Sequence, residues 1–332
     1  MTKVTRQGIG VAYLIGVDEA GYGPNLGPLV IGGTLWRIED PQGDLAAVDL
    51  YQRLQNVVGT KPSPQRLAIA DSKVIYAKRK DLSLLEEAVL ATCDRAKSVL
   101  PIWQGACEVD FADEAVGDHA PWYQGWESPF PLHTTSEIVT RRRDGFSACC
   151  DEEGITLADV QSMFLTAKRF NARLVACDNK STVLSQATMG LVCHLLQTIP
   201  TDQSQAIRIV CDKHGGRDYY LGLLQHFFPD VWWQPWEESK AVSRYAAEVG
   251  PHQVTIEFRS KGEGFLPTAL ASIYAKFHRE VAMLAFNRYW ATHVPGIAET
   301  AGYPVDAKRF AQETEAARKK LGIAWETFWR LK

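Results

Sequence analysis

The sequence predicts an α/β protein in which helices cover both faces of a mixed β-sheet. Apolar runs of strand length occur at residues 11–17, 29–38 and 207–212. In the second half of the chain, strand-like and helix-like segments alternate, which is typical of a sheet that contains parallel strands. The 332 residues are enough to bury a full core as one large domain or two small ones.

The first third of the chain predicts a hairpin followed by a helix. Residues 11–17 are apolar throughout, as in a strand that is buried on both faces. A glycine- and proline-rich link joins them to residues 29–38, so the two strands are expected to form a hairpin with a wide turn. We expect a loop at residues 70–73, a helix at 81–97 and a candidate third strand at 98–108.

Residues 109–150 differ in character from the rest of the chain. They are rich in tryptophan, proline, glycine and acidic residues, and they show no clear period. Trp122, Trp126 and Phe130 need a surface to pack on, so an elaborated insertion explains this region better than a linker does. We place the insertion at about residues 109–170.

The remaining segments are assigned by their period and by the residues at their ends. A long helix is the clearest of them, because Leu270, Ile273, Phe277, Val281 and Leu284 lie down one side. A C-terminal helical portion begins at about residue 285. The predicted elements are a helix at 156–171, a short strand at 173–178, a helix at 186–197, a strand at 207–212, a helix at 219–228, a strand at 254–260, a helix at 267–290 and a helix at 306–321.

The net charge of −3 argues against a strongly basic nucleic-acid coat protein. The charge is unevenly distributed, because residues 107–175 hold twelve acidic and six basic side chains. The rest of the chain is therefore positive overall, which is compatible with binding nucleic acid.

The cysteines and the termini indicate an intracellular protein. Seven cysteines, an odd number without a Cys-x-x-Cys pair, predict buried free thiols in a reducing compartment. The first residues contain no apolar signal region, and no apolar run reaches the roughly 18 residues of a membrane span. We expect a cytoplasmic protein that does not bind a membrane and acts as a monomer.

The dipeptide Asp18-Glu19 is the strongest functional signal in the chain. It follows the apolar run at residues 13–17, where two adjacent negative charges are costly unless a cation or hydrogen-bond donors compensate them. The glycines Gly21, Gly23 and Gly27 then allow the backbone to approach a ligand closely. This pattern predicts a divalent-metal site that acts on a phosphodiester.

Two further carboxylates are expected to join this pair. Asp212 ends another apolar strand, and ligands gather at the carboxyl ends of strands in α/β sheets. Glu280 shares one face of the long predicted helix with Ser272 and Lys276. Oxygen ligands of this kind suit Mg²⁺ or Mn²⁺, and two such ions about 3.5–4 Å apart can support phosphodiester cleavage.

Each carboxylate taken singly also has an ordinary explanation. Asp18 could cap a turn, Asp212 could be a turn residue, and Glu280 could be a solvated helix residue. His214 and His278 are better explained as partly buried histidines than as metal ligands. Only the joint pattern of the four carboxylates favours a metal site.

A series of short motifs reinforces this interpretation. In their order along the chain they resemble those of the type 2 ribonuclease H family, which comprises ribonucleases HII and HIII, from residue 14 to about 310. The motifs are Asp18-Glu19-Ala20-Gly21-Tyr22-Gly23-Pro24 with Gly27-Pro28, Asp71-Ser72-Lys73, Gln186-Ala187-Thr188, Lys261-Gly262-Glu263, Ala271-Ser272-Ile273-Tyr274-Ala275-Lys276 and Gly302-Tyr303-Pro304.

The resemblance implies an RNase H-like fold with a five-stranded mixed sheet, forming a single catalytic domain over residues 10–332. It also implies metal-dependent cleavage of the RNA strand of RNA–DNA hybrids, which leaves a 3′-hydroxyl and a 5′-phosphate. Carried over motif by motif, the catalytic and metal-binding residues are Asp18, Glu19, Asp212 and Glu280. The substrate-binding residues are Gly21, Tyr22, Gly23, Ser72, Lys73, Lys276 and Tyr303.

The chain departs from ribonuclease HII at two positions. Tyr22 stands where ribonuclease HII usually has arginine, and Glu280 stands where it usually has aspartate; ribonuclease HIII is similar to this chain in both respects. The glycine-flanked backbone reads the ribose 2′-hydroxyl in this family, so Tyr22 predicts weaker recognition of a single embedded ribonucleotide. The extra N-terminal domain of ribonuclease HIII is not seen in this sequence.

Two other functions are compatible with parts of the pattern. Tyr22, Glu280 and the insertion would also suit an RNase H-like nucleic-acid-binding protein that has lost catalysis. An actin-like phosphotransferase also ends its first strand in an aspartate followed by glycines. Glu19 and the Ala-Ser-Ile-x-Ala-Lys helix argue against the phosphotransferase.

Overall fold

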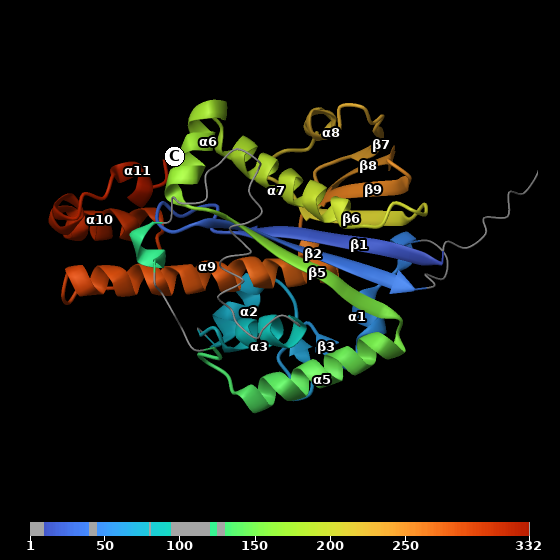
Figure 1. Ribbon diagram of the computed structural model, residues 1–332, viewed down its shortest axis with the longest axis horizontal. Helices are drawn as coiled ribbons and strands as arrows, with labels where there is room; N and C mark the ends of the chain where they lie inside the picture. The colour runs from blue at the N-terminus through green and yellow to red at the C-terminus, as the bar shows by residue number, and fades with distance from the viewer. Residues whose placement is uncertain (1–9, 40–44, 80, 94–119, 125–129, 332) are drawn as a thin grey trace, which may run out of the picture.

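A seven-stranded mixed sheet runs through the centre of the molecule (Figure 1). The computed structural model describes residues 10–39, 45–79, 81–93, 120–124 and 130–331. The strands lie in the order β5-β2-β1-β6-β9-β8-β7. Their bounds are β1 Val11–Ala20, β2 Leu29–Glu39, β5 Ile155–Leu165, β6 Ala206–Asp212, β7 Gln234–Glu238, β8 Val242–Val249 and β9 His252–Arg259, and a separate small sheet pairs β3 Val58–Gly59 with β4 Leu67–Ala68.

Strand directions divide the sheet into three parts. β5, β2 and β1 are antiparallel neighbours, β1, β6 and β9 are parallel, and β8 and β7 return in antiparallel fashion. The carboxyl ends of β1 and β6 therefore meet at one edge of the sheet. This mixed sheet flanked by helices confirms the expected RNase H-like fold class, with seven strands rather than five. The hairpin β7–β8 supplies the additional strands.

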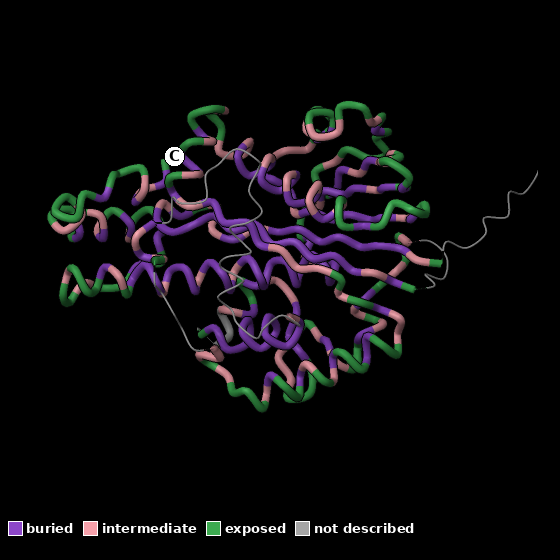
Figure 2. Tube along the Cα trace, in the orientation of Figure 1, coloured by how far each residue is buried: buried purple, intermediate pink, exposed green. Residues whose placement is uncertain are grey.

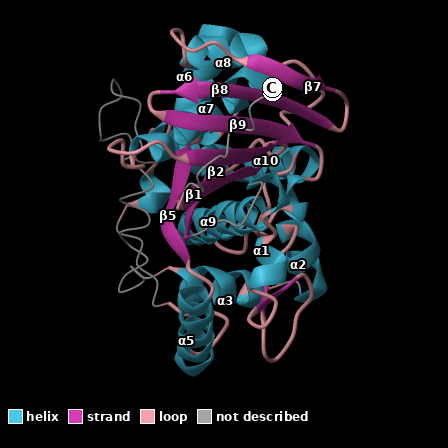
Figure 3. Cartoon of the chain, turned by 90° about the vertical axis from the view of Figure 1, so that its right-hand side faces the viewer, coloured by secondary structure: helices cyan, strands magenta, loops and turns pink. Residues whose placement is uncertain are grey.

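Helices cover both faces of the sheet (Figures 1 and 3). α7 packs on one face, and α9, with α3 and α5 beyond it, packs on the other. The bounds are α1 Leu50–Arg53, α2 Ser72–Arg79, α3 Ser83–Thr92, α5 Ser136–Glu152, α6 Ala167–Cys177, α7 Lys180–Gln197, α8 Leu221–Phe227, α9 Leu266–His293, α10 Pro304–Lys320 and α11 Trp325–Phe328, with short 3₁₀ turns η1 Leu45–Ala47, η2 Pro121–Tyr123 and η3 Gly262–Gly264.

The long helix α9 lies unusually close to the sheet. A Cβ atom on Gly16 would lie 2.1 Å from the carbonyl carbon of Pro267, and one on Gly32 would lie 2.3 Å from the carbonyl oxygen of Ala271. Glycine is therefore required at both positions. Most of α9 is buried, as Figure 2 shows along its length. This contact sets the position of Ser272, one residue beyond Ala271, against the end of β1.

The structure corrects several predicted elements. Residues 156–171 were expected to be a helix, but they contain most of the edge strand β5 and the start of α6. The predicted strand at 173–178 lies within α6. The expected loop at 70–73 includes the start of α2, and β7 and β8 were not predicted. The candidate strand at 98–108 lies outside the described residues.

The region expected to be an insertion contributes to the core. It holds α5 and β5, and β5 pairs with β2 along its whole length. Trp122 packs edge to face on Phe286 of α9 at 5.0 Å between ring centroids, and it also contacts Trp290. The aromatic residue thus has the packing surface that its size requires.

The remaining predicted properties concern thiols and membranes. Cys149, Cys150 and Cys211 are buried free thiols, as expected. Within the described ranges, no helix combines the length and the apolar character needed to cross a membrane.

Candidate metal centre

Three carboxylates converge at the shared carboxyl edge of β1 and β6. β1 continues to Ala20, so Asp18 and Glu19 lie within the strand rather than beyond it. Val17 is in register with Cys211, which sets Asp18 beside Asp212 at the end of the neighbouring parallel strand. One carboxylate oxygen from each of Asp18, Glu19 and Asp212 lies within 4.8 Å of the others. We call these three residues the acidic triad.

Burial and mutual repulsion raise the pKa values of the acidic triad. The pKa of Asp18 is held well above its usual range by burial and then by the charges of Glu19 and Asp212. Burial and the charge of Asp212 raise the pKa of Glu19 to about 7. Burial also raises the pKa of Asp212, and nearby Glu263 adds to the effect. A divalent cation would remove this repulsion, so the donor set fits a hard, oxygen-binding metal.

Hydrogen-bond donors fix the orientation of the acidic triad. The Ser272 hydroxyl of α9 is bonded to Asp18, and Ser272 Oγ lies 2.9 Å from Ser72 Oγ. The N–H of Gly262 donates to Asp212 Oδ1 at 3.2 Å. Both of these donors to the acidic triad, Ser272 and Gly262, belong to predicted motifs, and Ser72 of a third motif reaches the triad through Ser272.

Lys73 lies close enough to the acidic triad for its charge to act on Glu19 and Asp212. It is exposed, and its N–H donates to Asp71 Oδ1 at 2.8 Å in the first turn of α2. Burial lowers its pKa, but the charges of Asp18, Asp71 and Glu19 outweigh that effect and hold the pKa above its usual value. An exposed cation beside buried carboxylates is suited to bind a phosphate that approaches a metal there.

Glu263 is a neighbour of the site to which the sequence assigned no role. Its charge acts on both Asp212 and Lys73. It lies in η3, directly after Gly262, and its position in the Lys261-Gly262-Glu263 motif is the only signal that could have indicated it.

Glu280 is ion-paired with two cations of its own helix, α9. Its Oε1 atom accepts hydrogen bonds from Lys276 Nζ at 2.6 Å and from Arg279 Nη1 at 2.9 Å. Among the described residues, the close cluster of carboxylates contains Asp18, Glu19 and Asp212 only. Lys276 and Glu280 share one face of α9, as expected, and they form an ion pair there. Assignment of Glu280 as a fourth ligand stays a prediction.

The glycine loop after β1 lies next to Tyr303. Gly21 has φ +89°, which favours glycine, and a Cβ there would lie 2.5 Å from Arg279 Nε. Gly23 is exposed, and a Cβ there would lie in ordinary van der Waals contact with Cε1 of Tyr303, at 3.8 Å. Tyr303 is about half exposed. The loop and Tyr303 therefore form an accessible surface beside the acidic triad.

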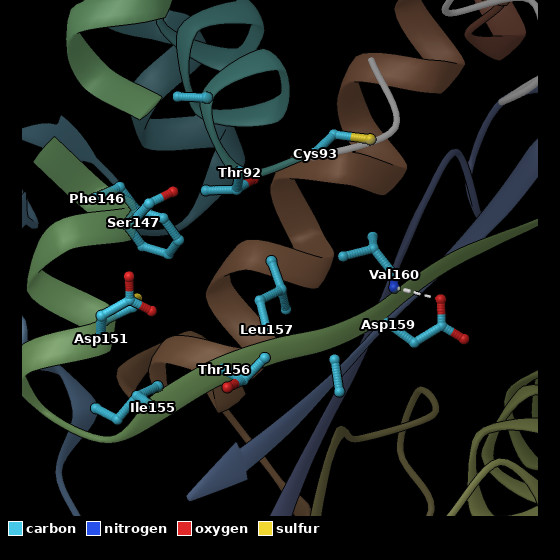
Figure 4. Close-up of a pocket in the computed structure, with 13 residues that line it drawn as sticks. Thr92, Cys93, Phe146, Ser147, Asp151, Ile155, Thr156, Leu157, Asp159 and Val160 are labelled. Carbon is cyan, nitrogen blue, oxygen red and sulfur yellow. Dashed lines mark hydrogen bonds between the residues drawn. The ribbon is translucent and has the colours of Figure 1, made fainter. Parts of the chain in front are cut away.

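A pocket elsewhere in the molecule does not belong to this site. It lies between α3, α5 and β5, where Phe146, Asp151 and Leu157 are among its lining residues (Figure 4). Asp159, which also lines it, accepts a hydrogen bond from the adjacent Val160 N–H. None of the acidic triad lines this pocket.

His214 and His278 are buried structural residues. His214 Nδ1 lies 2.9 Å from Ser185 Oγ, and His278 Nδ1 lies 2.9 Å from Ser162 Oγ. Burial lowers the pKa of each to about 3, so both side chains are neutral near pH 7.

Comparison with known proteins gives matches among solved structures alone. No protein-family model and no curated protein matches the chain. Similar solved structures include ribonuclease HII from Archaeoglobus fulgidus, described in complex with PCNA, at 13% identity over 96% of each chain with a TM-score of 0.39. Ribonuclease H2 from Pyrococcus horikoshii is 16% identical over 95% of this chain and 92% of that chain, with a TM-score of 0.42.

A third similar structure is Bst-RNase HIII in complex with Mn²⁺. It is 13% identical over 96% of this chain and 66% of that chain, with a TM-score of 0.40. These solved structures are ribonucleases of the types that the motifs resemble.

Proposed function

We propose that this chain is a metal-dependent endonuclease that cleaves the RNA strand of RNA–DNA hybrids. The observation that carries the proposal is the acidic triad, three carboxylates from two parallel strands whose pKa values are raised by burial and proximity. Such a group lowers the stability of the folded protein, and a divalent-metal function explains its presence. The motifs around it favour a ribonuclease H over other metal-dependent hydrolases.

The chain's own residues have distinct proposed roles. Asp18, Glu19 and Asp212 would hold Mg²⁺ or Mn²⁺, with Glu280 as a fourth carboxylate. Two ions bound there would activate a water and stabilise the leaving oxygen at phosphorus. No protein nucleophile is required. Lys276 would orient Glu280.

The substrate would lie along the open side of this centre. Ser72 and Lys73 would bind phosphate oxygens, and the backbone of the Gly21–Gly23 loop would contact the ribose. Tyr303 would stack on a sugar or base. With Tyr22 between the two glycines, we expect a longer RNA run to be cut better than a single embedded ribonucleotide.

The pairing of Glu280 with two cations favours one alternative, a protein that binds the hybrid without cutting it. A non-catalytic protein could retain the basic and aromatic surface while the fourth carboxylate serves as an ion-pair partner. Binding of the hybrid without Mg²⁺-dependent cleavage would identify this alternative.

The substitution Asp18→Asn tests the proposal. It removes one negative charge with almost no change in volume, so we expect the fold to persist and Mg²⁺-dependent cleavage of a labelled RNA–DNA hybrid to be lost. Asp202→Asn is the matched control, because Asp202 is exposed and lies before the amino-terminal end of β6, at the opposite end of that strand from Asp212. Wild-type turnover by the Asp18→Asn variant would contradict the assignment.

A further inference from the structure

The turn between β7 and β8 (residues 239–241) lies at the same edge of the sheet as the acidic triad. β8 is antiparallel to β9, and its first residue, Val242, is in register with Arg259 at the carboxyl end of β9. Arg259 is in turn in register with Asp212, the last residue of β6. The hairpin β7–β8, which lies beyond β9 in Figure 3, therefore has its turn at the acidic edge of the sheet.

Hydrogen bonds from a neighbouring segment hold the β7–β8 turn in place. Ser260 donates its hydroxyl to Lys240 O at 3.1 Å and its N–H to Ala241 O at 2.9 Å. Ser260 lies two residues before Gly262, whose N–H donates to Asp212 Oδ1. The backbone of the turn is thus tied to the same short segment that orients a carboxylate of the acidic triad.

Lys240 is an exposed lysine in this turn. Among the described residues, no carboxylate pairs with its ammonium group or with that of Lys261, which is also exposed. The carboxylates of the hairpin that are nearest in the chain have other partners, because Glu237 accepts a hydrogen bond from within the turn and Glu238 accepts one from the Tyr245 hydroxyl. A cation on a backbone that is already fixed loses little conformational freedom when it meets an anion.

Three arginines beside the turn share a single buried carboxylate. Glu257 of β9 is 1% exposed. Its oxygens lie 3.0 Å from Arg208 Nε, 3.6 Å from Arg244 Nε and 3.6 Å from Arg259 Nη1. Even with Glu237, opposite Arg244 across the hairpin, two carboxylates face three arginines. The group is therefore positive overall although each arginine is ion-paired, and two of the arginines are partly exposed.

We infer that Lys240 binds a backbone phosphate of the nucleic-acid substrate at the β9 side of the acidic triad. The inference rests on the proposed function and deepens it by giving a binding role to the hairpin that extends the sheet beyond five strands. An extended polyanion suits this edge better than a small anion does, because Lys240 and Lys73 belong to separate elements around the acidic triad and a chain of phosphates can contact both.

The salt dependence of binding tests this contact directly. Affinity for a fluorescent RNA–DNA hybrid is measured by anisotropy between about 50 and 200 mM salt, with Ca²⁺ in place of Mg²⁺, for wild type and Lys240→Gln. Glutamine is neutral and polar, and the turn is held by backbone atoms of residue 240, so the fold should persist. Loss of one phosphate contact lowers the slope of log affinity against log salt by about 1. The wild type should therefore lose about fourfold more affinity over this range than the variant does.

Two further variants separate charge from structure. Lys240→Arg keeps the charge and should keep the wild-type slope. Lys320→Gln removes an exposed lysine at the carboxyl end of α10, which lies far from β7 and β8 in Figure 1, and it should also keep the slope. An unchanged slope in a folded Lys240→Gln protein would overturn the inference while the proposed function stands. A wild-type chain that neither binds nor cuts the hybrid would overturn both.

Discussion

Removing one charge from the acidic triad should stabilise the metal-free protein. In Glu19→Gln the neutral side chain has almost the same size, and it cannot ionise. Burial and the charge of Asp212 raise the pKa of Glu19 from 4.5 to about 7. The folded state therefore binds the proton of the Glu19 carboxyl group more tightly than the unfolded state does. The stabilising contribution of neutral Glu19 is lost as the pH rises through about 7.

The size of the effect follows from the pKa shift. One pKa unit corresponds to about 1.4 kcal/mol, so ionised Glu19 costs up to about 3 kcal/mol of unfolding free energy at about pH 8. At about pH 5 the folded group is protonated, and the cost falls to about 1 kcal/mol. Glu19→Gln should therefore be more stable than wild type mainly at the higher pH.

Urea unfolding in EDTA at the two pH values measures this difference. His214 and His278 act in the opposite sense, because their lowered pKa values reduce stability as the pH falls below about 6.5. Comparing the variant with wild type at each pH cancels their contribution. Addition of Mg²⁺ at about pH 8 should stabilise wild type more than Glu19→Gln. Equal stability of the two proteins at both pH values would refute the electrostatic account of the site.

Two other substitutions test the surroundings of the acidic triad. Gly21→Ala places a Cβ 2.5 Å from Arg279 Nε at a φ of +89°. Thermal unfolding should therefore show that the free energy of unfolding falls by about 1–3 kcal/mol. An unchanged melting temperature would contradict the close contact. Glu280→Gln weakens the pairs with Lys276 and Arg279 and should lower the cleavage rate by about tenfold or more with a higher Mg²⁺ requirement. Unaltered Mg²⁺ dependence in that variant would exclude Glu280 as a metal ligand.

The central strands and the long helix could be predicted from the sequence because their patterns are strong and local. Residues 11–17 and 29–38 are apolar runs, and they form most of β1 and β2. The apolar stripe of α9 extends over several turns, so its period is clear. Signals of this length leave little room for an alternative structure.

The edge strand β5 could not be predicted because long-range pairing determines its structure. Residues 156–171 contain Leu157, Ala158 and Met163, which favour a helix when considered alone. Antiparallel pairing with β2 overrides that preference, and a register shift at Leu35/Trp36 breaks the alternation that would have indicated a strand. The hairpin β7–β8 was also missed. Every residue of β7 is exposed, so this strand has no alternation of buried and exposed residues that would have indicated it.

The site residues also divide into those that could be predicted from local sequence and those whose contacts depend on distant parts of the chain. Asp18, Glu19 and Asp212 could be grouped because strand ends in one sheet meet at a common edge. Arg330 reaches the glycine loop from about 300 residues away in the chain, and nothing in its local sequence indicates that contact. Lys180 is the first residue of α7, which begins six residues before the helix predicted at 186–197, and its position over Tyr22 depends on how two elements pack.

Cleavage of a labelled RNA–DNA hybrid by the wild-type chain tests the central claim most directly. The substrate is incubated with Mg²⁺ or with EDTA, beside a DNA duplex of the same sequence, and the ends of the products are identified. We predict Mg²⁺-dependent cuts in the RNA strand of the hybrid alone, with 3′-hydroxyl and 5′-phosphate ends. An intact hybrid together with ATP turnover in the absence of nucleic acid would contradict the account and favour a phosphotransferase.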